Sequence, residues 1–156
     1  MSEINTRITQ IISVLEKEDV LLSDVSKRLF DAQILDENWL KNTLAKPEGI
    51  DKLESFGSKF CRMQDTFVDK LVPILLTKLG EISSSAVNNL NKLERLNIVS
   101  DANNWLDMRL LRNKLVHEYV DDTSELLEHL LLAKESSKQL HNSYSKVKNI
   151  LNETLI

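Results

Sequence analysis

The sequence predicts an all-α protein whose helices run up and down as a bundle with short connections. Apolar residues recur at spacings of three and four along the whole chain, which is the period of one face of a helix. Three glycines and two prolines in 156 residues are too few for the many turns of a β architecture. Because this length suits one domain with one substantial core, we expect residues 1–156 to form a single domain.

Three helices are predicted in the first half of the chain. A short apolar stripe near the N-terminus ends at the charged residues 16–19, and a second helix follows over residues 22–44. Residues 46–49, Lys-Pro-Glu-Gly, make the clearest break, because proline disfavours helix in the residue before it. A long third helix begins at Ile50, and Pro73 is expected to kink it or to begin its last segment.

Two further helices are predicted next, each with a side chain that can cap it. Gly80 ends the third helix, and the serines at 83–85 can cap a short helix. Ser100 or Asp101 caps the helix after it, which is expected to run to about Val120.

The last helix is predicted to be the longest, with a cap in the Asp-Asp-Thr-Ser segment at residues 121–124. Its apolar residues recur mostly at spacings of three and four, which suits packing inside a bundle or against a second subunit. The members of this seam are Leu126, Leu130, Ala133, Leu140, Tyr144, Val147 and Leu151.

Composition and charge limit the possible partners and compartment. The formal net charge of −4 gives no broad attraction to nucleic acid, so any grip on RNA must be local, through Arg109, Arg112 and Lys114. The single cysteine, Cys61, fits a reducing compartment, and its place beside an apolar stripe predicts a buried thiol. The sequence contains neither a secretory signal pattern nor an uncharged apolar stretch of membrane-spanning length, so we expect a cytoplasmic protein without membrane contact.

The most informative segment lies in the helix before the last one, where Arg112, Asn113, His117 and Tyr119 stand close together in an apolar setting. On an ideal helix, Asn113 and His117 share a face, about 40° apart, and Arg112 and Tyr119 lie within about 20° of each other. Arg112 and His117 are about 140° apart, so they flank Asn113. Two such helices meeting across a two-fold axis would place two arginines and two histidines around one cleft.

An arginine and a histidine together suit cleavage of an RNA phosphodiester without a metal ion. Histidine can accept the proton of the 2′-hydroxyl or protonate the leaving oxygen, and arginine can hold the phosphate as negative charge builds. A 2′-hydroxyl nucleophile restricts the substrate to RNA. The alternative is a structural role, because Arg-x4-His occurs by chance in many helices and a helical histidine is usually a surface or core residue.

The pattern Arg112-Asn113-x-x-x-His117-x-Tyr119 resembles the signature of the HEPN superfamily, and within it the HepT-type toxins. The specific part of the resemblance is confined to residues 105–119. It implies a four- or five-helix bundle that dimerises, with Arg112 and His117 as the catalytic residues of a ribonuclease and Asn113 in support. It also implies an MNT-type nucleotidyltransferase antitoxin as partner, which transfers AMP from ATP to Tyr119.

Other polar residues near the motif are candidates for supporting roles. Arg62, Gln64 and Asp65 can reach it from the neighbouring helix, although an ordinary surface or second-layer position is more common for such residues. Arg109 lies one turn before Arg112 on the motif helix and is a further candidate.

No metal or cofactor site is expected from the sequence. His129 and His141 have no second histidine or cysteine at ligand spacing, so they are expected to be seam or surface histidines. The sequence also has no glycine-rich phosphate loop.

Two other functions remain open from the sequence. The chain can be a non-catalytic subunit that presents substrate to a nucleotidyltransferase and holds a phosphate or nucleotide in the same cleft. It can also be a purely structural dimerisation bundle, a function that leaves the Arg–Asn–His set unexplained.

Overall fold

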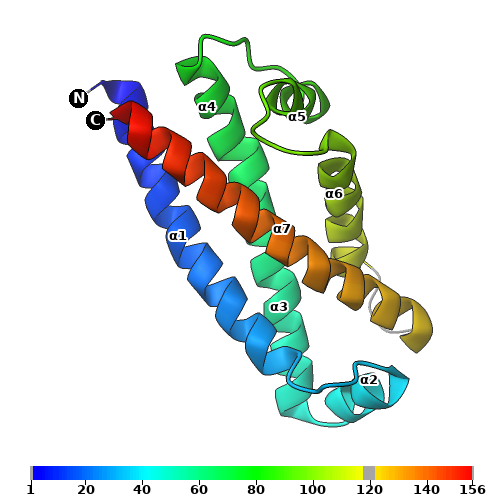
Figure 1. Ribbon diagram of the computed structural model, residues 1–156. Coiled ribbons are helices and arrows are strands. Elements are labelled where there is room, and N and C mark those ends of the chain that lie inside the picture. The colour runs from blue at the N-terminus through cyan, green and yellow to red at the C-terminus, as the bar shows by residue number, and fades with distance from the viewer. Residues whose placement is uncertain (1, 118–121, 156) are drawn as a thin grey trace.

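The computed structural model describes residues 2–117 and 122–155, except for the side chains of residues 116, 117, 154 and 155. All regular structure in this part of the chain is helical (Figure 1), as predicted. The elements are α1 (Glu3–Leu29), α2 (Glu37–Leu44), α3 (Pro47–Asp65), the π-helical segment η1 (Thr66–Leu71), α4 (Val72–Lys78), α5 (Ala86–Arg95), α6 (Ala102–His117) and α7 (Thr123–Leu155).

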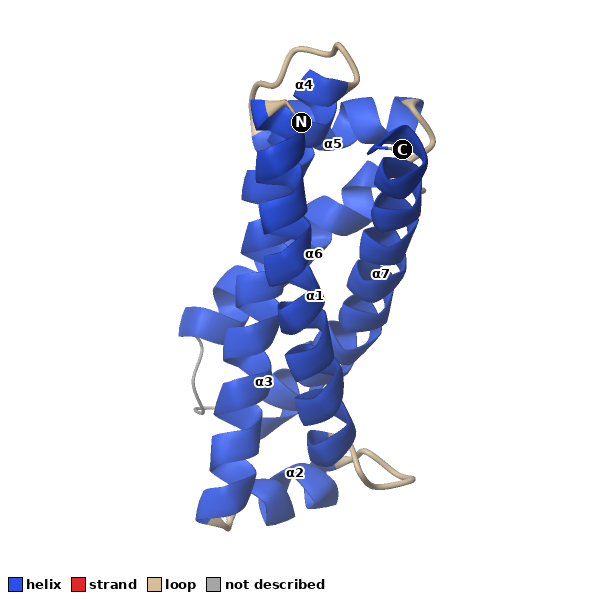
Figure 2. Ribbon diagram, turned by 90° about the vertical axis from the view of Figure 1, so that its left-hand side faces the viewer, coloured by secondary structure: helices blue, strands red, loops and turns tan. Residues whose placement is uncertain are grey.

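The long helices alternate in direction. In Figure 1, α1 descends, α3 returns upward through η1 and α4, α6 descends again, and α7 climbs back to the level of the N-terminus. The short helices α2 and α5 lie at the two ends, and both chain termini lie at the same end. Figure 2 shows α1, α3 and α7 running alongside one another. The motif helix α6 packs on α3, α5 and α7.

Helix α1 is longer than the sequence predicts. It continues through the charged residues 16–19, where a break is expected, and ends at Leu29. Glutamate and lysine are good helix formers, so a charged run does not by itself end a helix. The buried face also continues on both sides of this run. Its members are Ile8, Leu15, Glu18, Leu22, Val25 and Leu29.

The first break falls instead at residues 30–36, inside the predicted helix 22–44, so that prediction is wrong. Asp36 is the N-cap of α2, and its carboxylate accepts a hydrogen bond from the backbone N–H of Trp39 at 2.9 Å. The turn places the Trp39 ring 5.6 Å from the ring of Phe30, centroid to centroid. The cap and the aromatic contact end one helix and begin another.

The third predicted helix contains a π-helical segment. Helix α3 passes directly into η1, where the backbone N–H of Val72 donates to the carbonyl of Phe67, five residues earlier. Pro73 lies in the first turn of α4, which confirms that it begins the last segment. Proline has no N–H, so the α-helical bond back to Asp69 cannot form, and the local change in winding occurs beside this gap.

The predicted caps of the later helices are confirmed. Ser85, Asp101 and Asp122 each accept a hydrogen bond from a backbone N–H two or three residues later. Gly80 ends α4 with a φ of 80°, a backbone conformation that glycine adopts without a steric penalty. Every member of the predicted seam on α7 is buried.

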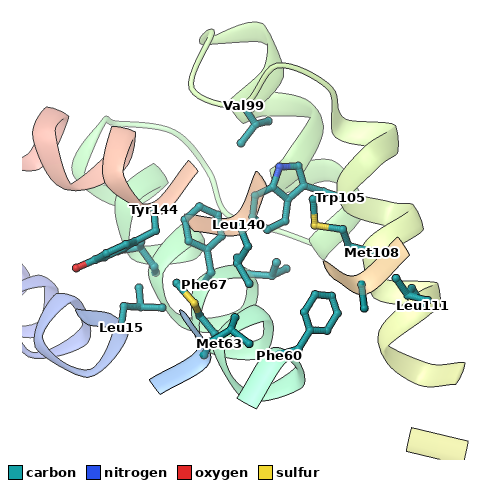
Figure 3. Packing of buried hydrophobic residues seen from close by; sticks show 14 of the residues in the cluster. Leu15, Phe60, Met63, Phe67, Val99, Trp105, Met108, Leu111, Leu140 and Tyr144 are labelled. Carbon is teal, nitrogen blue, oxygen red and sulfur yellow. The ribbon is translucent and has the colours of Figure 1, made fainter. Parts of the chain in front are cut away.

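An aromatic stack holds α6 against η1. The rings of Phe67 and Trp105 lie 4.7 Å apart between centroids and are nearly parallel, at 13°. Met108 and Leu111 continue the buried face of α6 at helical spacing. Figure 3 shows Trp105, Met108 and Leu111 pointing from α6 towards the side of Phe67 and Phe60. This face sets the rotation of α6 about its axis, and therefore where its arginines point.

Replacing Gly49 with alanine should destabilise the protein. An added Cβ would collide with the backbone carbonyl of Thr43, so α2 and α3 would have to move apart. We expect the free energy of unfolding, measured by urea titration, to fall by about 1–3 kcal/mol. The control is Gly57→Ala in the interior of α3, where a Cβ meets nothing within 4 Å. It should raise the stability by about 0.5–1 kcal/mol. Equal effects of the two substitutions would contradict the close contact at Gly49.

Glu18 should make stability depend on pH. Its side chain is 8% exposed, and burial raises the pKa of this carboxyl above its ordinary value, against the opposing effects of Thr66, Arg62 and Lys70. The folded state therefore holds the proton more tightly than the unfolded state. The contribution of Glu18 to the free energy of unfolding is therefore fully present below the pKa that this residue has in the unfolded state. It is lost as the pH rises through the raised pKa of the folded state.

Glu18→Gln removes the free-energy cost of ionising a buried carboxyl, because the amide never ionises. The variant should be more stable than the parent at pH 7, and the difference should shrink towards zero near about pH 4. Thermal unfolding followed by circular dichroism across this range measures it. An effect of the same size at both pH values would show that ionisation of Glu18 is not the cause.

Candidate functional site

The two arginines of α6 meet two carboxylates on the facing segment. Arg112 Nη2 lies 2.7 Å from Asp65 Oδ2, and Arg109 Nη1 lies 3.3 Å from Asp69 Oδ1. The arginines are three residues apart and the aspartates four, so each pair of like charges lies on one helical face. Asp65 is the last residue of α3 and Asp69 lies in η1. Phe67 lies between these two aspartates in the sequence, and its stack on Trp105 of α6 holds the two segments together.

Arg112 is a fixed and oriented cation. Its side chain is 30% exposed, and its Nη1 donates a hydrogen bond to Asn113 Oδ1 at 3.1 Å. The hydrogen bond to Asp65 raises the pKa of the guanidinium above its ordinary value, so it stays charged. Its Nε is buried and finds no acceptor within the described part of the chain.

A cavity of about 650 Å³ is lined by Asp65, the partner of Arg112, whereas Arg112 and Asn113 themselves are not among its lining residues. Its apolar lining residues include Leu53, Leu115, Leu126 and Leu130. These residues come from α3, from the end of α6 and from the start of α7. The polar residues that line the cavity include Ser58, Arg62, Asp65, Thr66, Asp69 and Lys70. The cavity volume is within the range of sites that bind small ligands.

Cys61 lines the cavity and contacts the motif helix. Its thiol is 3.8 Å from the carbonyl oxygen of Arg112, within range of a weak hydrogen bond. The residue is buried, as predicted, and burial raises the pKa of the thiol above its ordinary value. The charge of Arg112 opposes this rise and that of Asp65 adds to it. The thiol is therefore mostly protonated at neutral pH, which makes it a poor nucleophile.

The structure brings several of the predicted residues together. Arg112, Asn113 and Asp65 form one connected set, and Arg62 lines the adjoining cavity. Arg109 pairs with Asp69 a turn away. Asp65 is in direct contact with the motif arginine, and its supporting role stays a prediction.

Two of the predicted site residues cannot be placed. His117 is the last residue of α6, and its side chain lies outside the described residues, as does the whole of Tyr119. The expected end of the motif helix near Val120 falls in the same gap. The predicted pairing of Asn113 with His117 on one face therefore stays a prediction.

Gln64 lies in the core instead of at the surface or near the motif. Its side chain is fully buried, and neither the amide nitrogen nor the amide oxygen finds a partner in the part of the chain that the structure describes. It is adjacent in sequence to Asp65, but on a helix neighbouring residues point about 100° apart. The packing of α3 on both α1 and α6 turns Asp65 to the motif and Gln64 to the interior.

Sequence reasoning missed Asp69 and Lys70, which line the cavity with Asp65. A usable signal was present in the spacing. Asp65 and Asp69 are four apart, and Arg109 and Arg112 are three apart, so two oppositely charged faces were available to pair. The pairing also depends on the register in which the two helices pack, which the spacing alone does not give.

The histidines of α7 have structural surroundings. His129 is buried in the seam. His141 Nδ1 lies 2.7 Å and 2.9 Å from the two carboxylate oxygens of Asp19. Among the described residues, no three histidine, cysteine, aspartate or glutamate side chains are grouped as metal ligands.

Comparisons with known proteins give no family for this chain. No family model, no curated protein and no solved structure matches it. Over residues 2–117 and 122–155, no helix has both the length and the apolar character needed to cross a membrane.

Proposed function

We propose that this chain is an endoribonuclease toxin that acts on RNA without a metal ion and is neutralised by an MNT-type nucleotidyltransferase. The observation that carries the proposal is the position of Arg112. It is a permanently charged guanidinium, held by Asp65 and Asn113 beside a cavity, on the helix that ends at His117. The resemblance of this helix to the HEPN signature supplies the reaction.

The proposed chemistry divides between two side chains. Arg112 binds the phosphate and stabilises the negative charge that builds during attack by the 2′-hydroxyl. His117 accepts the hydroxyl proton or protonates the leaving oxygen. Asp65 orients the guanidinium before RNA binds, and the exposed part of the Arg112 side chain remains for the phosphate. Asn113 supports the same group through its side-chain oxygen.

The active form is proposed to be a homodimer of four- to five-helix bundles in the cytoplasm. Arg112 and His117 are about 140° apart around an ideal helix, so one subunit holds them on different sides of Asn113. A two-fold axis beside α6 would allow the arginine of one subunit and the histidine of the other to reach the same phosphate.

A non-catalytic nucleotide-binding subunit is the second candidate, and the cavity favours it. The apolar lining residues Leu53, Leu115, Leu126 and Leu130 suit a nucleobase, and the cavity volume suits a single nucleotide. Asp65 also satisfies Arg112 in the structure, as a binding site without chemistry would allow. The two functions differ in whether RNA is cut.

The ribonuclease proposal predicts cleavage that survives EDTA and depends on two residues. Arg112→Ala and His117→Ala should each reduce the cleavage rate of a labelled RNA by about 10²-fold or more, because each loses one part of the transition-state stabilisation. The matched control is Arg95→Ala at the exposed end of α5, which should cut RNA as fast as the parent.

Circular dichroism and thermal melts must first show that the variants are folded. Cleavage by Arg112→Ala at the parental rate would place the activity elsewhere or in a contaminant. Absence of cleavage by the folded parent, together with binding of a nucleotide that Arg112→Ala abolishes, would favour the non-catalytic subunit.

Tyr119 is proposed to be the regulatory residue and not a third catalyst. Its phenol has a pKa near about 10 when unperturbed, so it is a poor proton carrier at neutral pH. A phosphate attached to it can pair with an arginine of the cleft and block the site. Tyr119→Phe should keep most of the ribonuclease activity and resist modification by the nucleotidyltransferase.

Intact-mass spectrometry after incubation with the partner and ATP tests this assignment. The parent should gain the mass of one or more AMP groups and the Tyr119→Phe variant none. An AMP adduct on Tyr119→Phe, or an unmodified parent, would show that the acceptor has been assigned wrongly.

A further inference from the structure

A second hollow lies between α1 and α7, away from the motif helix. Its volume is about 480 Å³, and none of its lining residues belongs to α6. The two helices run side by side in both views of the molecule (Figure 1, Figure 2). The lining comes from residues 19–27 of α1, from Phe30 just after the end of this helix, and from residues 134–142 of α7.

This groove carries a charge opposite to that of the whole chain. Lys27, Lys134 and Lys138 line it, and Asp19 is the only carboxylate among its lining residues. The chain as a whole has 24 acidic and 20 basic residues. Three ammonium groups therefore gather around one hollow of an acidic protein. This local excess favours an anionic ligand.

The lysines are poorly neutralised by the protein. Neither Lys27 nor Lys134 has a carboxylate within 4.0 Å among the described residues, and Lys138 reaches Glu135 only at 3.7 Å, with both side chains exposed. Lys134 and Lys138 are four residues apart on one helix, where like charges repel. The ammonium group of Lys134 lies 5.8 Å from the centroid of the Phe30 ring, which gives it a preferred position.

The acidic residue of the groove has its own partner. Both carboxylate oxygens of Asp19 lie within hydrogen-bond distance of His141 Nδ1. Asp19 therefore lies at the His141 end of the groove and leaves the lysines free. The hydroxyl groups of Ser23 and Ser26 and the amide of Asn142 also line the hollow and can donate further hydrogen bonds.

We propose that this groove binds a compact anion with one to three phosphoryl groups. Ammonium and hydroxyl donors are the groups that phosphate oxygens accept from, and charge-assisted bonds to phosphate are strong. A long polyanion fits less well, because the lysines are confined to one hollow of about 480 Å³ and the carboxylate of Asp19 lies at its His141 end. The site does not depend on the proposed ribonuclease function.

Isothermal titration calorimetry with tripolyphosphate at low salt tests the proposal on the full chain. We expect one site per chain, with an affinity that falls as salt is added. Lys27→Gln and Lys134→Gln should each weaken binding about tenfold, because each loses one charge-assisted contact. The matched control is Lys17→Gln, which removes the same charge from an exposed position of α1 outside the groove. It should bind like the parent.

Further titrations identify the source of the phosphate and separate this site from the other cavity. ATP binding more tightly than tripolyphosphate would show a nucleotide ligand, and equal affinity would show recognition of the phosphate chain alone. In the Arg112→Ala background, Lys134→Gln should still weaken tripolyphosphate binding about tenfold. Because all substituted lysines are exposed or half-buried, the variants should melt like the parent.

Three results would overturn the proposal. They are absence of tripolyphosphate binding by the folded parent, equal weakening by Lys17→Gln and Lys134→Gln, and a requirement for Arg112. Tight binding of single-stranded RNA that depends on Lys27 and Lys134, without binding of tripolyphosphate, would also reject the compact ligand.

Discussion

The contact between Phe67 and Trp105 is the interaction on which the candidate site depends. It holds α6 against the π-helical segment η1, with two nearly parallel rings buried in the core. Because side chains three and four residues apart share a helix face, fixing Trp105 also fixes the direction of Arg109 and Arg112. Their contacts with Asp65 and Asp69 follow from this rotation. The electrostatics of the site thus rests on apolar packing.

The pairing of Arg112 with Asp65 would have two opposite effects on the binding of the proposed phosphate ligand. The carboxylate restrains a long, flexible side chain, which lowers the entropy lost when the ligand binds. The carboxylate also neutralises part of the positive charge of Arg112. When a phosphate binds, the carboxylate must share the guanidinium with it or lose the contact. The pair is partly exposed, so it contributes at most about 1 kcal/mol to folding. A weak pair of this kind is easily exchanged for a stronger one with phosphate.

The sequence predicted those features that local patterns determine. The helical class, the caps at Ser85, Asp101 and Asp122, and the buried seam of α7 depend on spacing and on short-range hydrogen bonds. The break between α1 and α2 was missed because it depends on contact between Phe30 and Trp39, which the apolar period does not encode. The same holds for the site. Arg112 could be predicted from the sequence of the motif helix. The position of Asp69 and the cavity could not, because they depend on how α3, α6 and α7 pack together.

The π-helical segment η1 places one extra residue in the chain between α3 and α4. A π-helical turn holds one residue more than an α-helical turn, and one residue corresponds to a rotation of about 100°. The segment therefore offsets the side chains after Leu71 from those before Thr66. This offset lets Phe60 and Met63 on one side and Leu75 and Leu76 on the other all face the core. Removal of one residue here would turn the segment into a regular α-helix and leave both sets facing the core, so a one-residue deletion is tolerated better in η1 than in the α-helical stretches on either side.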